Sequence, residues 1–219
     1  MRSDVAVLFD LDGVIVDSRA FHMEAWHRWA REHAIAHEPD YFHRMFGHRN
    51  DAIIGGLRPE VTAGELQGLA EHKESLFREE ARGQIVTLPG VRELLDSLDA
   101  SDAPRAIVTS TPRANLDMIL DSLGLRERFQ ALVAEEDASK GKPDPEGFLV
   151  AAERLGVAPG QCVVIEDAPA GLRAAKAGGM RAIGVTTTHP AADLGDADLV
   201  VDTLTLTGEA VRVFILRDV

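Results

Sequence analysis

The residues best suited to chemistry are acidic and occur as two pairs, each at the end of an apolar run. Asp10 and Asp12 follow the first such run, and Glu166 and Asp167 follow a later one. Carboxylates gathered close together are costly unless protons or a cation offset their charge. Carboxylate and carbonyl oxygens that leave room for water and phosphate suit Mg²⁺. If the two runs are neighbouring strands, these four acids predict a magnesium site.

Two further segments carry groups that an anion such as phosphate needs. Thr109, Ser110 and Thr111 follow another apolar run and precede Pro112, so their hydroxyls could lie at a helix N-terminus, which attracts anions. Ser110 or Thr111 is equally suited to cap that helix. Lys142 lies in a loop with Gly and Pro before another predicted helix. It could neutralise an anion, although a lysine in such a loop is commonly a solvated surface residue.

The elements that must position these residues alternate along most of the chain. Short aliphatic runs, rich in β-branched residues, predict buried parallel strands at 5–9, 105–108, 131–133, 162–165, 182–185 and 199–201. Stretches with Pro at the start and Gly at the end predict helices at 112–124, 145–156 and 169–178. The alternation predicts an α/β fold with a doubly wound parallel sheet. Ligands of such sheets bind at the carboxyl ends of the strands.

One segment, 18–85, has no convincing strand run and carries amphipathic helical patterns instead. We therefore expect an all-helical domain at 18–85, inserted into an α/β core formed by 1–17 and 86–219. Two chain crossings between domains can act as a hinge. Within the insertion, Trp26 and Trp29 are expected to form its core rather than a platform for a ligand.

Composition excludes several classes of partner. A net charge of -13 disfavours nucleic acid and anionic membranes, because both are bound through basic surfaces. No stretch reaches the length of a membrane span, and no extended apolar leader precedes the first predicted strand. The single cysteine, Cys162, lies in an apolar run, which predicts a buried strand thiol rather than a nucleophile. We expect a cytoplasmic protein that is a monomer or a weak homo-oligomer.

Four ordered segments resemble the motifs of the haloacid dehalogenase superfamily, and together they span essentially the whole chain. They are Asp-Leu-Asp-Gly-Val-Ile-Val-Asp-Ser at 10–18, Thr109, Lys142-Pro143, and Glu-Asp-Ala-Pro-Ala-Gly at 166–171. Four motifs in order are a far more specific signal than one Asp-x-Asp. The helical insertion is similar to the cap domain of the β-phosphoglucomutase-like and phosphoglycolate-phosphatase-like branch.

The resemblance implies a role for each acid of the first motif. Asp10 would be the nucleophile and would form an aspartyl-phosphate. Asp12 would protonate the leaving alcohol and then remove a proton from the attacking water, and its main-chain carbonyl would bind the metal. Dehalogenase members lack this second acid, because a halide leaves without a proton. The presence of Asp12 therefore favours phosphate esters.

The resemblance also implies roles for the other three motifs. Thr109 would bind a phosphoryl oxygen, with Ser110 beside it, and Lys142 would lie between the phosphate and Asp10. Asp167 would bind Mg²⁺ directly, and Glu166 would be a further ligand or would support one.

Specificity is expected to come from the cap, through His22, Arg49 and Lys73. The cap segment 46–51 reads Phe-Gly-His-Arg-Asn-Asp. An always-protonated Arg cannot form the imine that a cap lysine forms in phosphonatases. The Ser-Arg pair characteristic of β-phosphoglucomutase is absent from this segment, although His22 and Lys73 fall near the positions where that enzyme contacts its sugar phosphate.

The expected function is therefore Mg²⁺-dependent hydrolysis of a small phosphorylated metabolite, such as a sugar or polyol phosphate. Two alternatives stay open. A β-phosphoglucomutase-like mutase would use the same core residues and protect its aspartyl-phosphate from water. A non-catalytic binding protein on the same fold would have been free to lose members of the set Asp10, Asp12, Thr109, Lys142 and Asp167.

Overall fold

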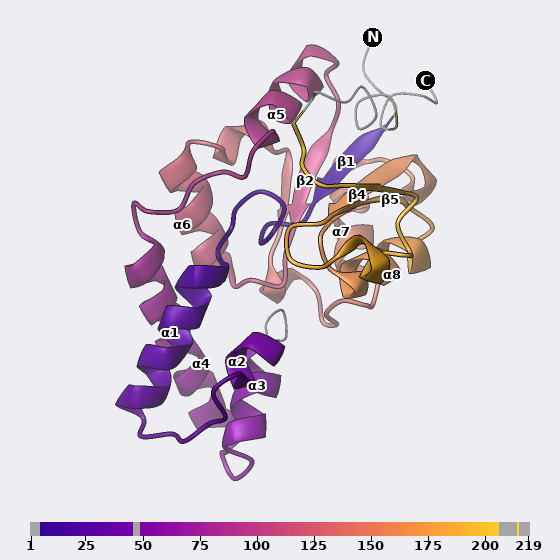
Figure 1. Cartoon of the computed structure of the whole chain (residues 1–219). Coiled ribbons are helices and arrows are strands. Elements are labelled where there is room, and N and C mark those ends of the chain that lie inside the picture. The colour runs from indigo at the N-terminus through magenta and orange to yellow at the C-terminus, as the bar shows by residue number, and fades with distance from the viewer. Residues whose placement is uncertain (1–4, 46–48, 206–213, 215–219) are drawn as a thin grey trace. The chain divides into compact units, whose positions relative to one another are not determined.

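The computed structural model describes residues 5–45, 49–205 and 214. These residues form two compact units, with boundaries between Asp17 and Ser18 and between Ile85 and Val86. We call residues 18–85 the helical unit and the remainder the core unit. Each is described by itself (Figure 1).

The core unit contains a parallel six-stranded sheet with the strand order β3-β2-β1-β4-β5-β6. Its strands are β1 (Ala6–Phe9), β2 (Arg105–Val108), β3 (Ala131–Val133), β4 (Cys162–Glu166), β5 (Arg181–Val185) and β6 (Leu199–Val201). The order reverses at β1, which leads on one side to β2 and on the other to β4. The predicted doubly wound parallel sheet is therefore confirmed.

Within the described part of the core unit, four α-helices accompany this sheet: α5 (Val91–Ala100), α6 (Arg113–Leu123), α7 (Glu146–Leu155) and α8 (Pro169–Ala177). Short 3-10 helices lie at Arg126–Arg128, Glu135–Asp137, Pro159–Gln161 and Ala191–Asp193. The predicted helices at 112–124 and 145–156 each start one residue later and end one residue earlier in the structure, because a proline takes the N-cap position and a glycine the C-cap position.

Both faces of the sheet are covered, which explains why its strands read as continuous apolar runs. Successive strand residues point to opposite faces. Ala6 and Leu8 of β1 pack with Phe148 of α7 and Leu172 of α8 in one buried cluster. Figure 1 shows α5 and α6 on the other side of the sheet, where the alternate residues, such as Phe9, are also fully buried.

The thiol of Cys162 lies in this buried layer at the start of β4, as predicted. Burial raises its pKa to about 11. A thiol that stays protonated is a poor nucleophile, so Cys162 serves packing.

The helical unit consists of α1 (Arg19–Glu32), α2 (Tyr41–Arg44), α3 (Asn50–Leu57) and α4 (Ala63–Ala81). Trp29 is fully buried, and its indole N–H donates to the Leu69 carbonyl at 3.0 Å. Trp26 is buried as well and stacks on Phe42, with ring centroids 5.3 Å apart. The expectation that both tryptophans form the core of this unit is confirmed. Among the residues described, no helix combines the length and apolar character needed to cross a membrane.

Candidate active site

Strand register brings the two predicted acidic pairs together. Phe9 of β1 pairs with Ile165 of β4, so the next residues, Asp10 and Glu166, stand level at the carboxyl ends of neighbouring strands. The Asp10 N–H donates to the Ile165 carbonyl at 3.0 Å. Asp167 follows directly at the same edge. The two acidic pairs of the sequence thus meet because their strands are adjacent and parallel.

Three of the acids form a buried cluster. Asp10, Glu166 and Asp167 are 7%, 1% and 4% exposed, and each places a carboxylate oxygen within 4.8 Å of the others. The Lys142 ammonium lies 2.5 Å from Asp10 Oδ1 and 2.6 Å from Glu166 Oε1. It also donates to the Val108 carbonyl at 3.3 Å. A cation from a distant loop is therefore inserted among the acids.

Two glycines allow the acids to lie this close to the backbone. A methyl group built on Gly171 would lie 1.7 Å from Glu166 Oε1. One built on Gly13 would lie 2.0 Å from Asp167 Oδ2, and Gly13 also has a positive φ of 87°. Any side chain at either position would displace a carboxylate of the cluster.

The electrostatics of the cluster call for additional positive charge. Burial raises the pKa of Asp10 to about 7, even though Lys142 acts to lower it. Burial, together with the charges of Glu166 and Asp10, raises the pKa of Asp167 to about 9. Burial acts to lower the pKa of Lys142, but the two adjoining carboxylates outweigh it and hold that pKa above its usual range. Three carboxylates facing one ammonium leave excess negative charge that protons or a divalent cation must offset.

The donor set fits a hard divalent cation such as Mg²⁺. All three cluster side chains offer hard carboxylate oxygens, and the described cluster contains no thiolate or imidazole ligand. Such oxygen ligands suit Mg²⁺ rather than softer transition metals. Asp10, Glu166 and Asp167 are the predicted metal-binding side chains that the structure brings together.

Asp12 lies apart from this trio, and its carboxylate has another partner. The side chain is half-buried, and Thr111 Oγ1 donates to Asp12 Oδ2 at 2.8 Å. The carboxylate is thereby oriented at the same edge of the sheet without belonging to the acidic cluster. Its predicted role as acid and base, and that of its carbonyl as a metal ligand, stay predictions.

The loop after β2 places its three hydroxyls differently. Thr109 is buried; its N–H donates to the Val133 carbonyl at 2.9 Å, and its hydroxyl accepts from the Thr111 N–H at 3.1 Å. Ser110 is exposed. Sequence reasoning assigned no catalytic part to Thr111, whose contact with Asp12 spans 99 positions of sequence.

The expected cap of α6 by Ser110 or Thr111 is wrong. Pro112 takes the N-cap position, and no side chain of the cap residue bonds to the helix. The Arg113 N–H donates instead to both carboxylate oxygens of Glu136, at 3.0 and 2.9 Å. Because Glu136, in the 3-10 helix Glu135–Asp137, accepts from this helix end, the local serine and threonine are not needed there.

A second residue missed from the sequence is Thr188, in the loop after β5. Its hydroxyl donates to Asp167 Oδ2. The neighbouring His189 places Nδ1 3.1 Å from the Asp167 carbonyl oxygen. A threonine that follows two others in a loop carries no local signal for such a contact.

The three substrate-binding residues predicted for the cap lie in the helical unit. Lys73 is 2% exposed, and its Nζ lies 2.7 Å from His22 Nδ1 and 2.8 Å from Glu74 Oε1. Arg49 occupies the N-cap position of α3, with its Nε 4.0 Å from Asp51 Oδ1. The structure therefore brings His22 and Lys73 into direct contact. Substrate contact by any of the three stays a prediction, and residues 46–48 of the predicted cap segment lie outside the described residues.

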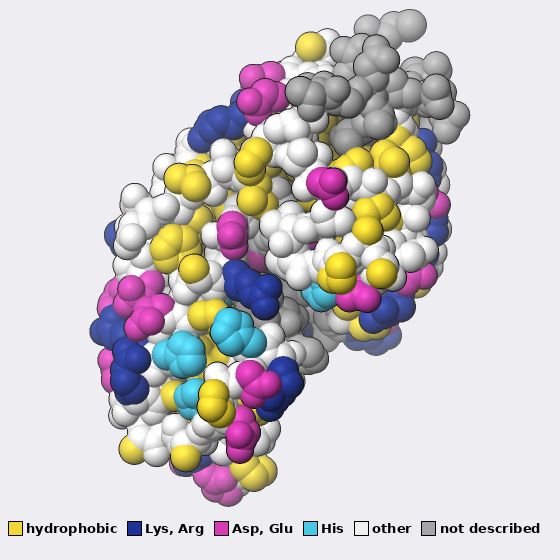
Figure 2. Space-filling model, in the orientation of Figure 1, with side chains coloured by type: hydrophobic (Ala, Val, Ile, Leu, Met, Phe, Trp, Pro, Cys, Tyr) yellow, Lys and Arg dark blue, Asp and Glu magenta, His cyan; other side chains and the backbone are white. Residues whose placement is uncertain are grey.

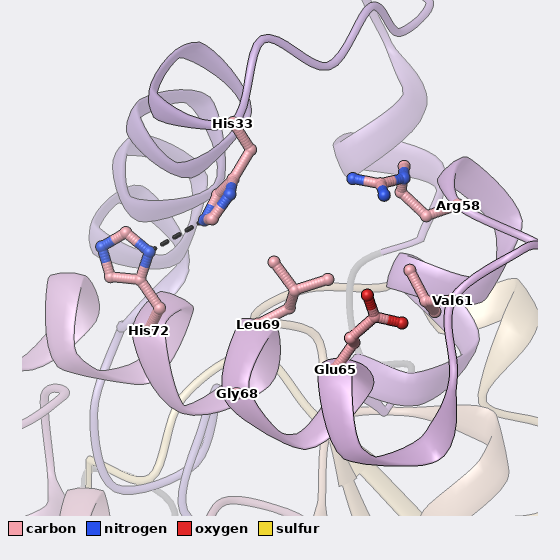
Figure 3. A pocket seen from close by; sticks show the side chains of 7 residues that line it. All are labelled: His33, Arg58, Val61, Glu65, Gly68, Leu69 and His72. Carbon is pink, nitrogen blue, oxygen red and sulfur yellow. Dashed lines mark hydrogen bonds between the residues drawn. The ribbon is translucent and has the colours of Figure 1, made fainter.

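The helical unit also carries a surface cavity of about 410 Å³ that contains none of the predicted site residues. It is lined by His33, Arg58, Val61, Glu65, Gly68, Leu69 and His72 (Figure 3). His33 Nε2 and His72 Nδ1 are hydrogen-bonded at 2.9 Å on one side of it. Figure 2 shows several histidine side chains at the surface of this unit. None of its lining residues belongs to the acidic cluster, which is part of the core unit.

Comparisons with known proteins show which family this chain resembles. A model of the haloacid dehalogenase-like hydrolases matches residues 5–179. The chain is 37% identical over 206 residues to validoxylamine A 7'-phosphate phosphatase of Streptomyces hygroscopicus subsp. limoneus, covering 90% of this chain and 93% of that protein. It is 38% identical over 205 residues to hexitol phosphatase A of Escherichia coli, covering 90% of each.

A mutase of the family is equally similar. The chain is 37% identical over 209 residues to β-phosphoglucomutase of Bacillus subtilis, covering 90% of this chain and 88% of that protein. A crystal structure of β-phosphoglucomutase from Clostridium difficile superposes with a TM-score of 0.83 and 27% identity, covering 100% of this chain and 98% of that one. The chain therefore belongs to the haloacid dehalogenase-like hydrolase family, as its four ordered motifs predicted.

Proposed function

We propose that this chain is a Mg²⁺-dependent phosphatase that hydrolyses a small sugar or polyol phosphate through an aspartyl-phosphate on Asp10, and that it acts in the cytoplasm. One observation carries the proposal. The buried Asp10 carboxylate lies at a strand end, in contact with the Lys142 ammonium and beside the acids Glu166 and Asp167. This combination of a nucleophile, a fixed cation and a set of metal ligands is what phosphoryl transfer requires.

The first half-reaction begins with attack of an Asp10 carboxylate oxygen on phosphorus, which breaks the bond to the ester oxygen. The departing alkoxide takes a proton from the carboxylic acid of Asp12. The hydrogen bond from Thr111 keeps the Asp12 side chain at the strand edge that carries Asp10. The products are a free alcohol and a phosphorylated Asp10.

In the second half-reaction a water molecule attacks the phosphorylated Asp10. The Asp12 carboxylate, now ionised, removes a proton from that water, and this proton restores the acid for the next cycle. Phosphate leaves, and the Asp10 carboxylate is regenerated. The same side chain thus acts first as acid and then as base.

The other core residues would neutralise charge and position the phosphoryl group. Asp10, Asp167 and the Asp12 carbonyl would bind Mg²⁺, with Glu166 beside them, and bound Mg²⁺ would neutralise charge on the phosphoryl oxygens. The Lys142 ammonium supplies a second positive charge beside Asp10. In this proposal the Thr109 and Ser110 hydroxyls bind the phosphoryl oxygens.

The helical unit is proposed to be the cap domain that selects the substrate. His22 and Lys73 form one polar contact, and Asn50, next to Arg49, donates to Glu74 at 2.8 Å. Because Glu74 also accepts from Lys73, these residues form a connected polar network. Hydrogen-bonding groups of this kind suit the hydroxyls of a sugar or polyol. The two phosphatase relatives described above are, by their names, a validoxylamine A 7'-phosphate phosphatase and a hexitol phosphatase.

The second candidate is a sugar phosphomutase, favoured by the similarity to β-phosphoglucomutase. Every core residue would serve both reactions, so the difference lies in whether water reaches the phosphorylated Asp10. The missing Ser-Arg pair in segment 46–51 favours the phosphatase.

The decisive test is a screen of phosphorylated metabolites for phosphate release, with Mg²⁺ and with EDTA, beside an assay for conversion of glucose 1-phosphate to glucose 6-phosphate. We expect Mg²⁺-dependent phosphate release from sugar or polyol phosphates and no isomer conversion. Isomer conversion without phosphate release would replace the phosphatase by the mutase. No turnover of any substrate, including a generic aryl phosphate, would favour a non-catalytic binding protein.

A further inference from the structure

Thr188 contacts the acidic cluster from a loop that none of the four motifs includes. Its hydroxyl is hydrogen-bonded to Asp167 Oδ2 and lies 3.4 Å from the Asp167 carbonyl oxygen. Thr188 is half-buried and follows β5, 21 positions after Asp167. The core fold therefore holds Asp167 from a second chain segment besides the one that follows β4.

The neighbouring His189 fixes the direction of these hydrogen bonds. His189 Nδ1 lies 3.1 Å from the Asp167 carbonyl oxygen and 2.9 Å from Thr188 Oγ1. A carbonyl oxygen can only accept, so the contact with Asp167 assigns a proton to Nδ1, and this one N–H is shared between the Asp167 carbonyl and Thr188 Oγ1. Thr188 Oγ1 then accepts from His189, and its single hydroxyl hydrogen is directed to Asp167 Oδ2. The chain of donors runs from His189 through Thr188 to Asp167.

The same carboxylate oxygen is confined from another side by Gly13. A methyl group at Gly13 would lie 2.0 Å from Asp167 Oδ2 but 3.1 Å from Oδ1. Rotation about the terminal bond of an aspartate is otherwise broad and roughly two-fold. A backbone surface on one side and a hydroxyl donor on the other restrict that rotation.

We propose that Thr188 is a positioning residue that holds Asp167 Oδ2, so that Asp167 presents its other oxygen to the cation. His189 orients the Thr188 hydroxyl in turn. The proposal rests on the proposed function, because it takes Asp167 as a ligand of Mg²⁺. Hydrogen bonds to ligating carboxylates pre-orient the ligand, and losing such a bond costs roughly 10–100-fold in metal affinity or activity.

The loop offers a matched control. Thr186 lies two positions earlier, and its hydroxyl donates to Asp202 Oδ1 at 2.9 Å in an exposed contact. Thr186→Val and Thr188→Val therefore remove the same group from one loop, and only the second removes it from Asp167. Thr188→Ser keeps the hydroxyl and removes only the methyl group.

The test is Mg²⁺ binding to the full, metal-stripped chain, measured by isothermal titration calorimetry. Thr188→Val is expected to raise the Mg²⁺ Kd by roughly 10–100-fold, whereas Thr186→Val and Thr188→Ser stay within about threefold of the parent. The melting temperature of Thr188→Val in EDTA should stay close to that of Thr186→Val. This result would separate a role toward the cation from support of the loop.

Three outcomes would contradict either the positioning role of Thr188 or the metal site on which it rests. An unchanged Kd in Thr188→Val, while Asp167→Asn loses binding, would overturn the positioning role and leave the proposed metal site intact. Equal losses in Thr188→Ser and Thr188→Val would overturn it too, because the hydroxyl would then not be the active group. Unchanged binding in Asp167→Asn would instead remove the metal site, and with it the proposed function.

Discussion

Replacing Lys142 by methionine removes an ammonium that lies within hydrogen-bond distance of both Asp10 and Glu166. The Asp10 contact is 2.5 Å, and the side chains of Lys142 and Asp10 are 15% and 10% exposed. Opposite charges at that separation attract by about 7 kcal/mol at an effective dielectric constant of 20. Desolvation offsets part of this attraction. Breaking a buried pair by removing one partner typically costs about 3–5 kcal/mol, and we expect that loss in the free energy of unfolding of the metal-free protein at pH 8.

The stability lost in Lys142→Met should be larger at high pH than at low pH. Burial, opposed by Lys142, sets the pKa of Asp10 at about 7, above its ordinary 3.8. At pH 5 Asp10 is protonated and gains little from Lys142, whereas at pH 8 it is ionised and gains most. Without Lys142 the folded-state pKa of Asp10 rises further. A raised folded-state pKa means stability that is lost as pH increases, so Lys142→Met should lose more stability at pH 8 than at pH 5.

The measurement is urea-induced unfolding in EDTA at both pH values, followed by circular dichroism. Fluorescence would be a poor probe, because both tryptophans, Trp26 and Trp29, lie in the helical unit. The matched control is Lys140→Met in the same loop, where the side chain is 69% exposed and its nitrogen lies 3.3 Å from Asp144. An exposed pair of this kind contributes about 1 kcal/mol at most. A loss below about 1 kcal/mol in Lys142→Met at pH 8, or equal losses at the two pH values, would refute the reasoning.

Three further predictions follow from the acidic cluster. Asp10→Asn should abolish phosphate release while leaving the circular dichroism spectrum unchanged, because the amide keeps the shape but cannot act as the nucleophile. Gly171→Ala should weaken Mg²⁺ binding and lower the melting temperature, since the new methyl group would lie 1.7 Å from Glu166 Oε1; its control is Gly160→Ala, where nothing lies within 4 Å. The increase in melting temperature caused by Mg²⁺ should be larger at pH 8 than at pH 6. Burial raises the pKa of Asp10 to about 7 and that of Asp167 to about 9, so metal-free stability falls as pH rises toward 9 and Mg²⁺ has more unbalanced charge to offset.

Each of these predictions has a contradicting result. Undiminished turnover by Asp10→Asn would remove the nucleophile assignment. Parent-like Mg²⁺ affinity in Gly171→Ala would mean that Glu166 can move without affecting the metal. A Mg²⁺-induced shift in melting temperature that is larger at pH 6 than at pH 8 would contradict the expectation that Mg²⁺ offsets more unbalanced charge at the higher pH.

Local sequence was a reliable guide to elements whose signal is local. Parallel strands buried on both faces must be apolar throughout, which is why the runs at 105–108, 131–133 and 199–201 coincide with β2, β3 and β6. Pro and Gly mark helix ends by their own backbone preferences, so the ends of α6 and α7 were predicted to within one residue. The acids at strand ends could be predicted to meet because parallel strands share one carboxyl edge.

Sequence reasoning failed where one residue is satisfied by another far along the chain. The N-terminus of α6 was expected to use Ser110 or Thr111, but Glu136 accepts from the Arg113 N–H. Thr111 does not cap the helix, and its hydroxyl donates to Asp12 instead. Neither contact has a local signature, because the partners lie on segments far apart in the sequence.

The sequence by itself determined the α/β class, the positions of strands β1 to β6 and of helices α6, α7 and α8, and the four motifs that identify the family. All of these depend on residue type, period and order along the chain. Only the tertiary structure decided which further side chains touch: Thr111 with Asp12 across 99 positions, and Thr188 with Asp167. The physical reason is that side-chain contacts between elements depend on strand register and on where each loop returns. Those are properties of the packed sheet as a whole rather than of any one segment.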